Sequence, residues 1–299
     1  MLSQRLKAAK VAAGGTQQFI AVSHVTTPFV TVYPWSGSGF GTKFANPATL
    51  PTSQGNGVAF TAAGNAIAVA HTLTPFVTAY PWSASGFGTK FTNPGTLPTG
   101  QGYDVAFTPS GNAIAVAHFT SPRITAYRWS VSGFGAKFTN PGTLPGGVVG
   151  TSVAFTPTSN AIAVGHSGTP FITAYPWSGS GFGTKFANPA TLPGGDVQAV
   201  KFSPAGNVIA MATFSTPFVA AYVWSAIGFG TKFANPATLP AALGRGVAFS
   251  PSGDAIAVAC DGSPFVTVYP WSGSGFGTKF ADPATLPAGQ GINVAFGAI

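Results

Sequence analysis

The feature that most constrains the fold is a repeat of about 47 residues that runs through almost the whole chain. Tryptophan marks it most clearly: the sequence contains six, and consecutive ones are 47 or 48 residues apart. They are Trp35, Trp82, Trp129, Trp177, Trp224 and Trp271. Around them recurs a consensus close to GVAFTPSGNAIAVAH, a variable triplet, PFVTAYPWSGSGFGTKFANPATLP and a variable linker. A period of this length indicates a solenoid, a propeller or another array of like units.

Each repeat contains four segments that have the pattern of a β-strand. Residues 105–107 form a short apolar run, and 109–112 have the composition of a tight turn. Residues 113–118 alternate alanine with larger side chains, which is the period of a strand. Residues 76–82 are rich in aromatic and β-branched types, and 86–91 follow after a turn. The sequence therefore predicts an all-β, six-bladed β-propeller of four-stranded antiparallel blades.

The two ends of the repeat array predict how the ring closes. The array begins at 19–24, which corresponds to the second strand of a blade, and ends at 292–296, which corresponds to a first strand. We expect the C-terminal strand, 292–299, to join the N-terminal blade, because closure removes a free sheet edge. The chain then divides into a basic N-terminal arm, 1–17, and the propeller domain, 18–299.

Composition agrees with this fold and argues against several classes of protein. Charged residues make up only 6% of the chain, and there is no Glu. No apolar run approaches the roughly 18 residues of a membrane span, and the arm lacks the apolar core of a signal peptide. The single Cys260 excludes an internal disulfide. We expect no membrane association.

The run V-A-F-[ST]-P-x-G-[ND]-x-I-A-V-A resembles the first two strands of WD-repeat and YVTN-type propellers, and the likeness extends from residue 19 to 299. The Gly-His and Trp-Asp pairs of WD repeats are missing, so their His–Asp hydrogen-bond tetrad is not carried over. The unit PFVTAYPWSGSGFGTKFANPATLP also resembles propeller proteins encoded by tailed bacteriophages. That second resemblance implies a virion accessory protein, as a capsid decoration or tail-associated protein, located in the virion or the host cytoplasm.

A ring of histidines at the end of the second strand invites comparison with a metal site. The equivalent positions carry His24, His71, His118, His166, Thr213 and Cys260. Neighbouring copies would lie roughly 10 Å apart, whereas a shared metal needs bonds of about 2 Å. We therefore expect each histidine to form a structural hydrogen bond to a loop carbonyl, with no metal and no other cofactor.

A ring of lysines lies on the fourth strand of each repeat. Its members are Lys43, Lys90, Lys137, Lys185, Lys232 and Lys279. Lysine on an exposed edge strand prevents edge-to-edge pairing. Because these charges are spread around a perimeter, they do not form the contiguous basic patch that nucleic-acid binding requires. We expect no nucleic-acid partner.

Catalysis has few residues to draw on. The chain has five aspartates, at mostly different repeat positions, whereas acid–base chemistry needs paired carboxylates or a His–carboxylate pair. Asp254 and Asp282 replace turn asparagines. Asp104, Asp196 and Asp261 leave a lactonase-like metal site as the enzymatic alternative. With no nucleophile motif, P-loop or dinucleotide fingerprint, the sequence predicts that the protein is not an enzyme.

Variation between repeats collects in the loop after the second strand and in the linker after Leu-Pro. In a propeller both sets of loops emerge on one face, so we expect that face to bind a protein partner within a larger assembly. Candidate contact residues there are Tyr103, Asp104, Phe119, Asp196, Phe214, Arg245 and Asp261. The alternative is a lectin-like propeller that binds a glycan between adjacent blades. A lectin would repeat its pocket residues, whereas these loops differ from blade to blade.

The N-terminal arm lies outside the repeats. Leu2 and Leu6 have helical spacing, with Arg5, Lys7 and Lys10 on the remaining surface. The arm is either a frayed terminus or a short amphipathic tether that docks the propeller on a larger assembly.

Overall fold

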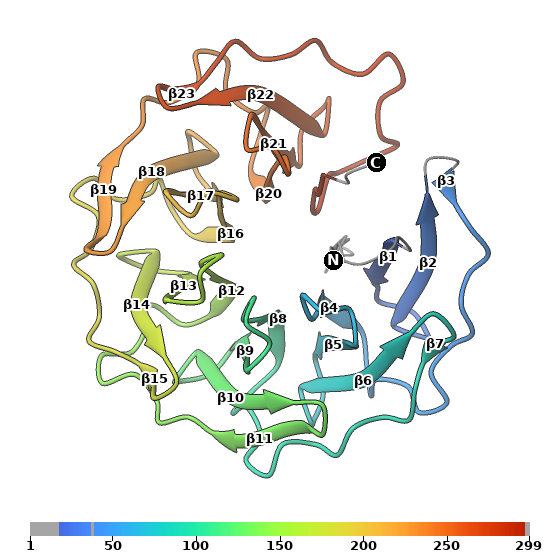
Figure 1. Ribbon diagram of the computed structural model, residues 1–299. Coiled ribbons are helices and arrows are strands. Elements are labelled where there is room, and N and C mark those ends of the chain that lie inside the picture. The colour runs from blue at the N-terminus through green and yellow to red at the C-terminus, as the bar shows by residue number, and fades with distance from the viewer. Residues whose placement is uncertain (1–17, 37–38, 297–299) are drawn as a thin grey trace.

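The computed structural model describes residues 18–36 and 39–296. In those ranges all regular secondary structure is β-strand. The strands form six antiparallel sheets arranged around a common axis (Figure 1). Five sheets have four strands and the N-terminal one has three. We number the sheets as blades in chain order, from β1–β3 (first blade) to β20–β23 (sixth blade). The predicted six-bladed propeller is confirmed.

Each blade runs outward from the axis as a meander of antiparallel strands. The innermost strands are β4 (Gly55–Phe60), β8 (Gly102–Phe107), β12 (Gly150–Phe155), β16 (Val197–Phe202) and β20 (Gly244–Phe249). The second strands are β1 (Gln18–Ser23), β5 (Ala66–His71), β9 (Ala113–His118), β13 (Ala161–His166), β17 (Val208–Thr213) and β21 (Ala255–Cys260). The third strands are β2 (Val30–Ser36), β6 (Val77–Ser83), β10 (Ile124–Ser130), β14 (Ile172–Ser178), β18 (Val219–Ser225) and β22 (Val266–Ser272). The outermost are β3 (Gly39–Phe40), β7 (Gly86–Phe87), β11 (Gly133–Lys137), β15 (Gly181–Phe182), β19 (Gly228–Lys232) and β23 (Gly275–Phe276).

Most second strands are buried on both faces because their sheets pack between two neighbours, whereas in β1 only alternate residues are buried. All six residues of β5 are buried, and the same holds for β9 and β13. In β5 the alanines alternate with Ile67 and Val69, and Ile67 pairs with Tyr80 of β6. An alanine face allows close approach of the next sheet, while Ile, Val and Tyr fill the space on the other face.

A tryptophan on each third strand joins one blade to the next. Trp177 of β14 contacts Phe138 of the preceding blade, with ring centroids 5.0 Å apart. It also contacts Phe155 at 5.1 Å and Phe182 at 5.0 Å, both from its own blade. All three contacts are edge-to-face, a geometry that contributes about 0.5–1.5 kcal/mol per pair beyond area burial. The same arrangement recurs at Trp82, Trp129, Trp224 and Trp271.

The seam between the first and sixth blades differs from the other junctions. Phe280, the counterpart of Phe138, is 51% exposed, and Trp35 has Phe40 as its only ring partner among the described aromatic residues. Residues 291–296 lie beside the sixth blade, where the Gly291 N–H donates to the Cys260 carbonyl at 2.9 Å (Figure 1). Within the described chain they form no strand with β1. Closure by 292–299 remains a prediction, and 297–299 lie outside the described residues.

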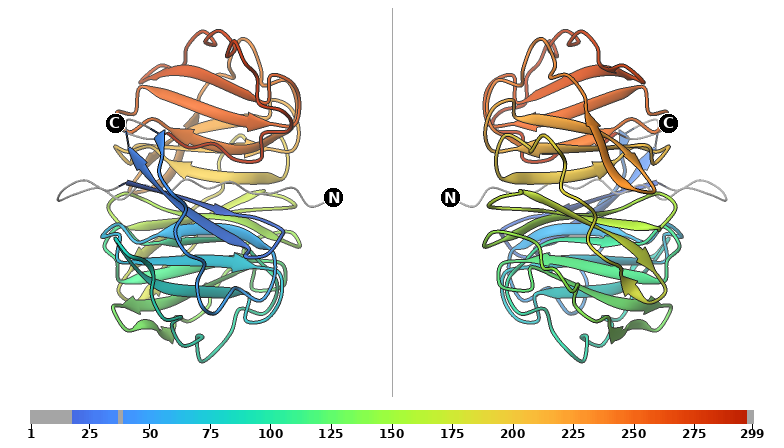
Figure 2. Two further views of the ribbon diagram at one scale, coloured as in Figure 1. Left: turned by 90° about the vertical axis from the view of Figure 1, so that its right-hand side faces the viewer. Right: turned by 90° about the vertical axis from the view of Figure 1, so that its left-hand side faces the viewer.

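Figure 2 shows the disc from its edge, with the strands running between its two faces. Loops from second to third strands, such as 72–76, share one face with the inter-blade linkers, such as 98–101; we call it the variable-loop face. Turns from first to second strands, such as 108–112, and from third to fourth strands, such as 83–86, share the other; we call it the turn face.

The tryptophan contacts predict unequal costs for two chemically identical substitutions. Trp177→Ala should lower the free energy of unfolding by about 3–5 kcal/mol, because it removes three ring contacts and leaves a cavity. Trp35→Ala should cost less than about 2 kcal/mol, because Trp35 is only half-buried. Urea and thermal unfolding of both variants measure the difference. Equal losses of unfolding free energy would show that Trp35 packs between the first and sixth blades as the other tryptophans pack between theirs.

Candidate functional site

The loops of the variable-loop face share one rigid frame. In the second blade the Phe76 N–H donates to the Leu73 carbonyl at 2.8 Å, and the His71 N–H donates to the Phe76 carbonyl at 2.9 Å. Phe76 has a φ of 69°, in the left-handed region, and its counterparts, Arg123 included, lie between 67° and 70°. The frame is thus constant, while the two residues that follow the second strand change from blade to blade.

Three large apolar side chains on this frame are exposed to solvent. Phe119 is 44% exposed and Phe214 is 54% exposed, as expected for two of the predicted contact residues. Leu73, one position further along its own loop, is 58% exposed. Sequence reasoning recognised the loop of Leu73 as variable but did not select this residue. Its signal is that the equivalent positions carry Thr, Gly or Ser.

Two charged candidates on this face are brought together. The Arg245 guanidinium on β20 donates to both carboxylate oxygens of Asp261, with Nε–Oδ1 and Nη2–Oδ2 distances of 2.8 Å. Asp261 begins the loop after β21, so this fork-to-fork pair ties the loop to the inner strand. Both side chains are half-buried, and each retains some exposed surface.

Asp196 connects two neighbouring loops of the variable-loop face. Its Oδ1 accepts a hydrogen bond from the Gly168 N–H of the fourth blade at 2.9 Å. Its carbonyl accepts one from the Phe214 N–H of the fifth blade at 2.8 Å. The backbone of Asp196 therefore helps to hold exposed Phe214 in position. The remaining candidate, Tyr103 of the third blade, is half-buried.

Asp104 does not belong to the exposed surface, contrary to its selection from the sequence. It is fully buried at the axis. Its Oδ2 accepts hydrogen bonds from the Ser152 hydroxyl at 2.9 Å and the Val153 N–H at 3.1 Å, both in the fourth blade. The cause is the position of Asp104 in its strand, since the third residue of each inner strand lies against the neighbouring blade. Gly57, the third residue of β4, shows how close this approach is: a Cβ there would lie 2.8 Å from the Asp104 Cα. Asp104 joins two blades and is not positioned to contact a macromolecular partner.

The histidine ring forms structural hydrogen bonds within blades. Nε2 of His71, His118 and His166 lies 2.9 Å from the hydroxyl of a threonine on the third strand of the same blade. Nδ1 of His166 also lies 3.1 Å from the Gly168 carbonyl, the kind of contact that the sequence predicted. The threonine partner was not predicted. Burial, as the main cause, lowers the pKa of all three histidines to about 4.

The other features singled out in the sequence are the candidate metal ligands, the lysine ring and the N-terminal arm. Among the described residues no group of three or more His, Cys, Asp or Glu side chains is placed to hold a metal ion. Lys90 of the lysine ring donates to Asn93 at 2.6 Å, and its equivalents make the same contact three residues along the chain. The arm residues lie outside the described ranges; they are Leu2, Arg5, Leu6, Lys7 and Lys10.

The fold and the site define the class of the protein as a six-bladed β-propeller with one diversified face. No protein-family model and no curated protein matches the sequence. In the described part of the chain, no helix is long and apolar enough to cross a membrane.

The histidine pKa values predict a loss of stability in acid. The folded-state pKa of about 4 lies below the ordinary 6.5, so the unfolded chain binds more protons in this window. The histidine contribution to stability is therefore full above pH 6.5, falls as the pH drops, and levels off below pH 4. At pH 5 each buried histidine costs about 2 kcal/mol. Unfolding midpoints measured between pH 7.5 and 4 should show the decline.

The fifth blade supplies the matched control for this prediction. It carries Thr213 and Ala220 where the third blade carries His118 and Thr125. The double variant His118→Thr/Thr125→Ala copies that natural pair, so it should fold and should lose stability less steeply in acid, by the share of one histidine. An unchanged pH dependence would mean that His118 does not remain neutral in the folded protein.

Proposed function

We propose that this protein is a non-catalytic recognition module, and that its variable-loop face binds another protein within a larger assembly. The observation that carries the proposal is the exposure of Leu73, Phe119 and Phe214 on the variable-loop face. Phe119 and Phe214 occupy the same variable position, where the other blades carry Val, Thr, Ser or Asp, and Leu73 is at the next position. Each stands on a hydrogen-bonded loop frame. Large apolar side chains exposed on one face support an interaction site there.

The distribution of these residues suits a partner that spans several blades. The exposed apolar residues come from the second, third and fifth blades, and the Arg245–Asp261 pair comes from the sixth. A standard protein–protein interface covers about 800 Å² on each side, which requires contacts from several such loops. Because the loops differ, a single asymmetric partner fits them better than six equal sugars.

The turn face also carries exposed apolar residues, although its turns vary less. Val131 is 83% exposed and Ile227 is 86% exposed, each in a turn between third and fourth strands. They depart singly from a turn that otherwise reads Ser-Gly-Ser-Gly or Ser-Ala-Ser-Gly. They therefore provide a control for general surface hydrophobicity.

The larger assembly in this proposal is a phage virion, with the propeller as a capsid decoration or tail-associated protein. Support for this part comes from the resemblance of the repeat unit PFVTAYPWSGSGFGTKFANPATLP to propellers encoded by tailed phages. The N-terminal arm, with three cations among its first ten residues besides Leu2 and Leu6, is the proposed tether to that assembly.

Substitution of the exposed loop residues tests the proposed binding face. The variant Leu73→Thr/Phe119→Ser/Phe214→Ser uses residues that other blades carry in the same loop, so the fold should remain intact. We expect it to bind the partner at least about tenfold more weakly, because it removes the exposed apolar anchors. Tagged wild-type and variant proteins would be compared by quantitative mass spectrometry of what they retain from particles and lysate of the source organism.

The control variant is Val131→Ala/Ile227→Ser, which returns two turn-face positions to residues found in other blades. It should retain the same partner as the wild type. Loss of the partner with this control and retention with the loop variant would place the interface on the turn face. Binding to a glycan array that is unaffected by the loop variant would instead favour a lectin with sites between blades.

A further inference from the structure

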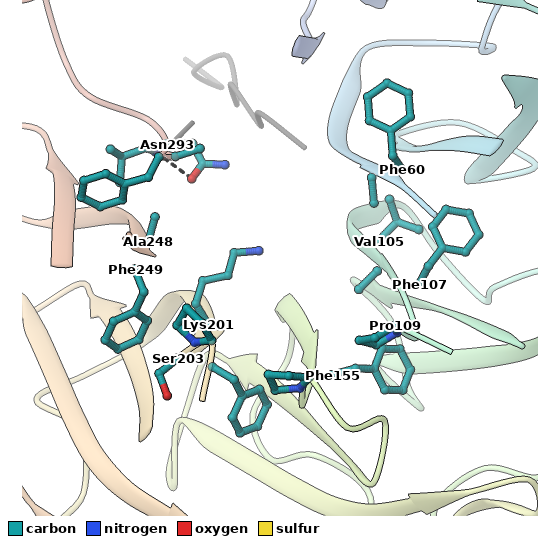
Figure 3. A pocket seen from close by; sticks show the side chains of 18 of the residues that line it. Phe60, Val105, Phe107, Pro109, Phe155, Lys201, Ser203, Ala248, Phe249 and Asn293 are labelled. Carbon is teal, nitrogen blue, oxygen red and sulfur yellow. Dashed lines mark hydrogen bonds between the residues drawn. The ribbon is translucent and has the colours of Figure 1, made fainter. Parts of the chain in front are cut away.

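A cavity of about 490 Å³ lies on the propeller axis (Figure 3). This volume is within the roughly 300–1,000 Å³ range of small-molecule sites. One phenylalanine from each repeat lines it: Phe60, Phe107, Phe155, Phe202, Phe249 and Phe296. Pro109, Pro157 and Pro204 line it too, and they belong to turns between first and second strands. The cavity is therefore near the turn face, at the opposite end of the axis from the variable loops.

Lys201 is the one cation among the lining residues that the structure describes. It stands on β16 at a position where all other repeats carry alanine: Ala59, Ala106, Ala154, Ala248 and Ala295. In Figure 3 its side chain extends into the open space, with Phe249 and Asn293 to one side and Val105 and Phe107 across from it. Lys201 is thus a single charge in an axial cavity whose other described lining side chains are uncharged.

The ammonium group of Lys201 has no hydrogen-bond or ion-pair partner among the described residues. Asp104, the buried acid of the inner strands, is committed to Ser152 and Val153 and does not line the cavity. Burial lowers the pKa of Lys201, because the cavity wall disfavours the charged form. A partly buried cation without a counter-charge is less stable than a fully solvated one, and an anion that enters the cavity would offset that difference.

We propose that the axial cavity binds a small anion with an apolar body, such as an aromatic carboxylate, through the ammonium group of Lys201. The carboxylate accepts a charge-assisted hydrogen bond from Lys201, and the alanine, valine and phenylalanine residues of the lining contact the apolar body. A single cation suits one negative charge better than the several charges of a phosphate ester. The site is distinct from the variable-loop face, so it stands or falls independently of the proposed function.

The probe for this site is 1-naphthoate, measured by isothermal titration calorimetry with the full-length protein. We expect saturable binding of one molecule per chain. The neutral analogue 1-naphthalenemethanol should bind at least about tenfold more weakly, because it lacks the charge that pairs with Lys201. Acetate, which has the charge without the apolar body, should bind weakly as well.

Lys201→Ala restores the residue of the other five repeats, so it should fold, and it should melt at a higher temperature than the wild type. It should bind 1-naphthoate at least about tenfold more weakly. Lys201→Met, which retains a long side chain without the charge, should behave in the same way. Lys185→Ala, which removes a perimeter lysine bonded to Asn188, should leave binding unchanged.

Three results would overturn the proposal. They are failure of the wild type to bind 1-naphthoate saturably, equal affinity of the wild type and Lys201→Ala for it, and equal affinity of the wild type for naphthoate and the neutral alcohol. Loss of binding in Lys185→Ala would also contradict it, because it would point to the perimeter of the disc.

Discussion

The edge-to-face packing of one tryptophan per blade against a phenylalanine of the preceding blade is the interaction on which the rest of the structure depends. Between blades the chain has side-chain packing and scattered hydrogen bonds, such as that from the Gly55 N–H to the His24 carbonyl, because every ladder of strand hydrogen bonds lies inside a blade. The aromatic contacts, such as Trp129 with Phe91, fix the spacing of neighbouring sheets at the wide outer part of the wedge. Alanines such as Ala68 and Ala115 permit close approach further in. Among the described residues Trp35 and Phe280 make no such contact, so the junction between the first and sixth blades differs from the other five.

Because a few positions fix the packing between blades, the repeat can stay nearly constant there while other positions vary. Positions that form blades and the tryptophan contacts change little, so the positions that differ between repeats stand out. Asp104 stands where the other repeats carry Gly, Ser, Ala or Asn, and it joins two blades. Phe119 and Phe214 share a variable loop position on a hydrogen-bonded frame, and both are exposed. Lys201 departs from alanine and becomes a lone charge in the axial cavity. In a repeat protein of this kind, single substitutions change the surface while the blades stay the same.

The repeat length, the period-two strands and the even tryptophan spacing were enough to predict the six-bladed fold. The same sequence could not place Asp104, because its burial depends on which residue of the inner strand faces the adjacent blade. The threonine partners of the histidines were also invisible, since pairing across strands requires the register of second and third strands. Lys201 could be seen in the sequence as a lysine at a position where the other repeats carry alanine. Its significance depends on the axial cavity, which the sequence does not show. The closing strand, predicted from the repeat arithmetic alone, is not joined to β1 in the described chain.

The most direct test of the central claim, that recognition is confined to one face of a constant scaffold, is amide hydrogen exchange of the propeller alone and bound to the protein that it captures. We expect slower amide exchange on binding in the loops at 72–76, 119–123 and 213–218 and in the neighbouring linkers. Exchange in the turns at 108–112 and 131–133 should not change. Protection that appears in those turns, or equally at all six junctions between blades, would contradict it.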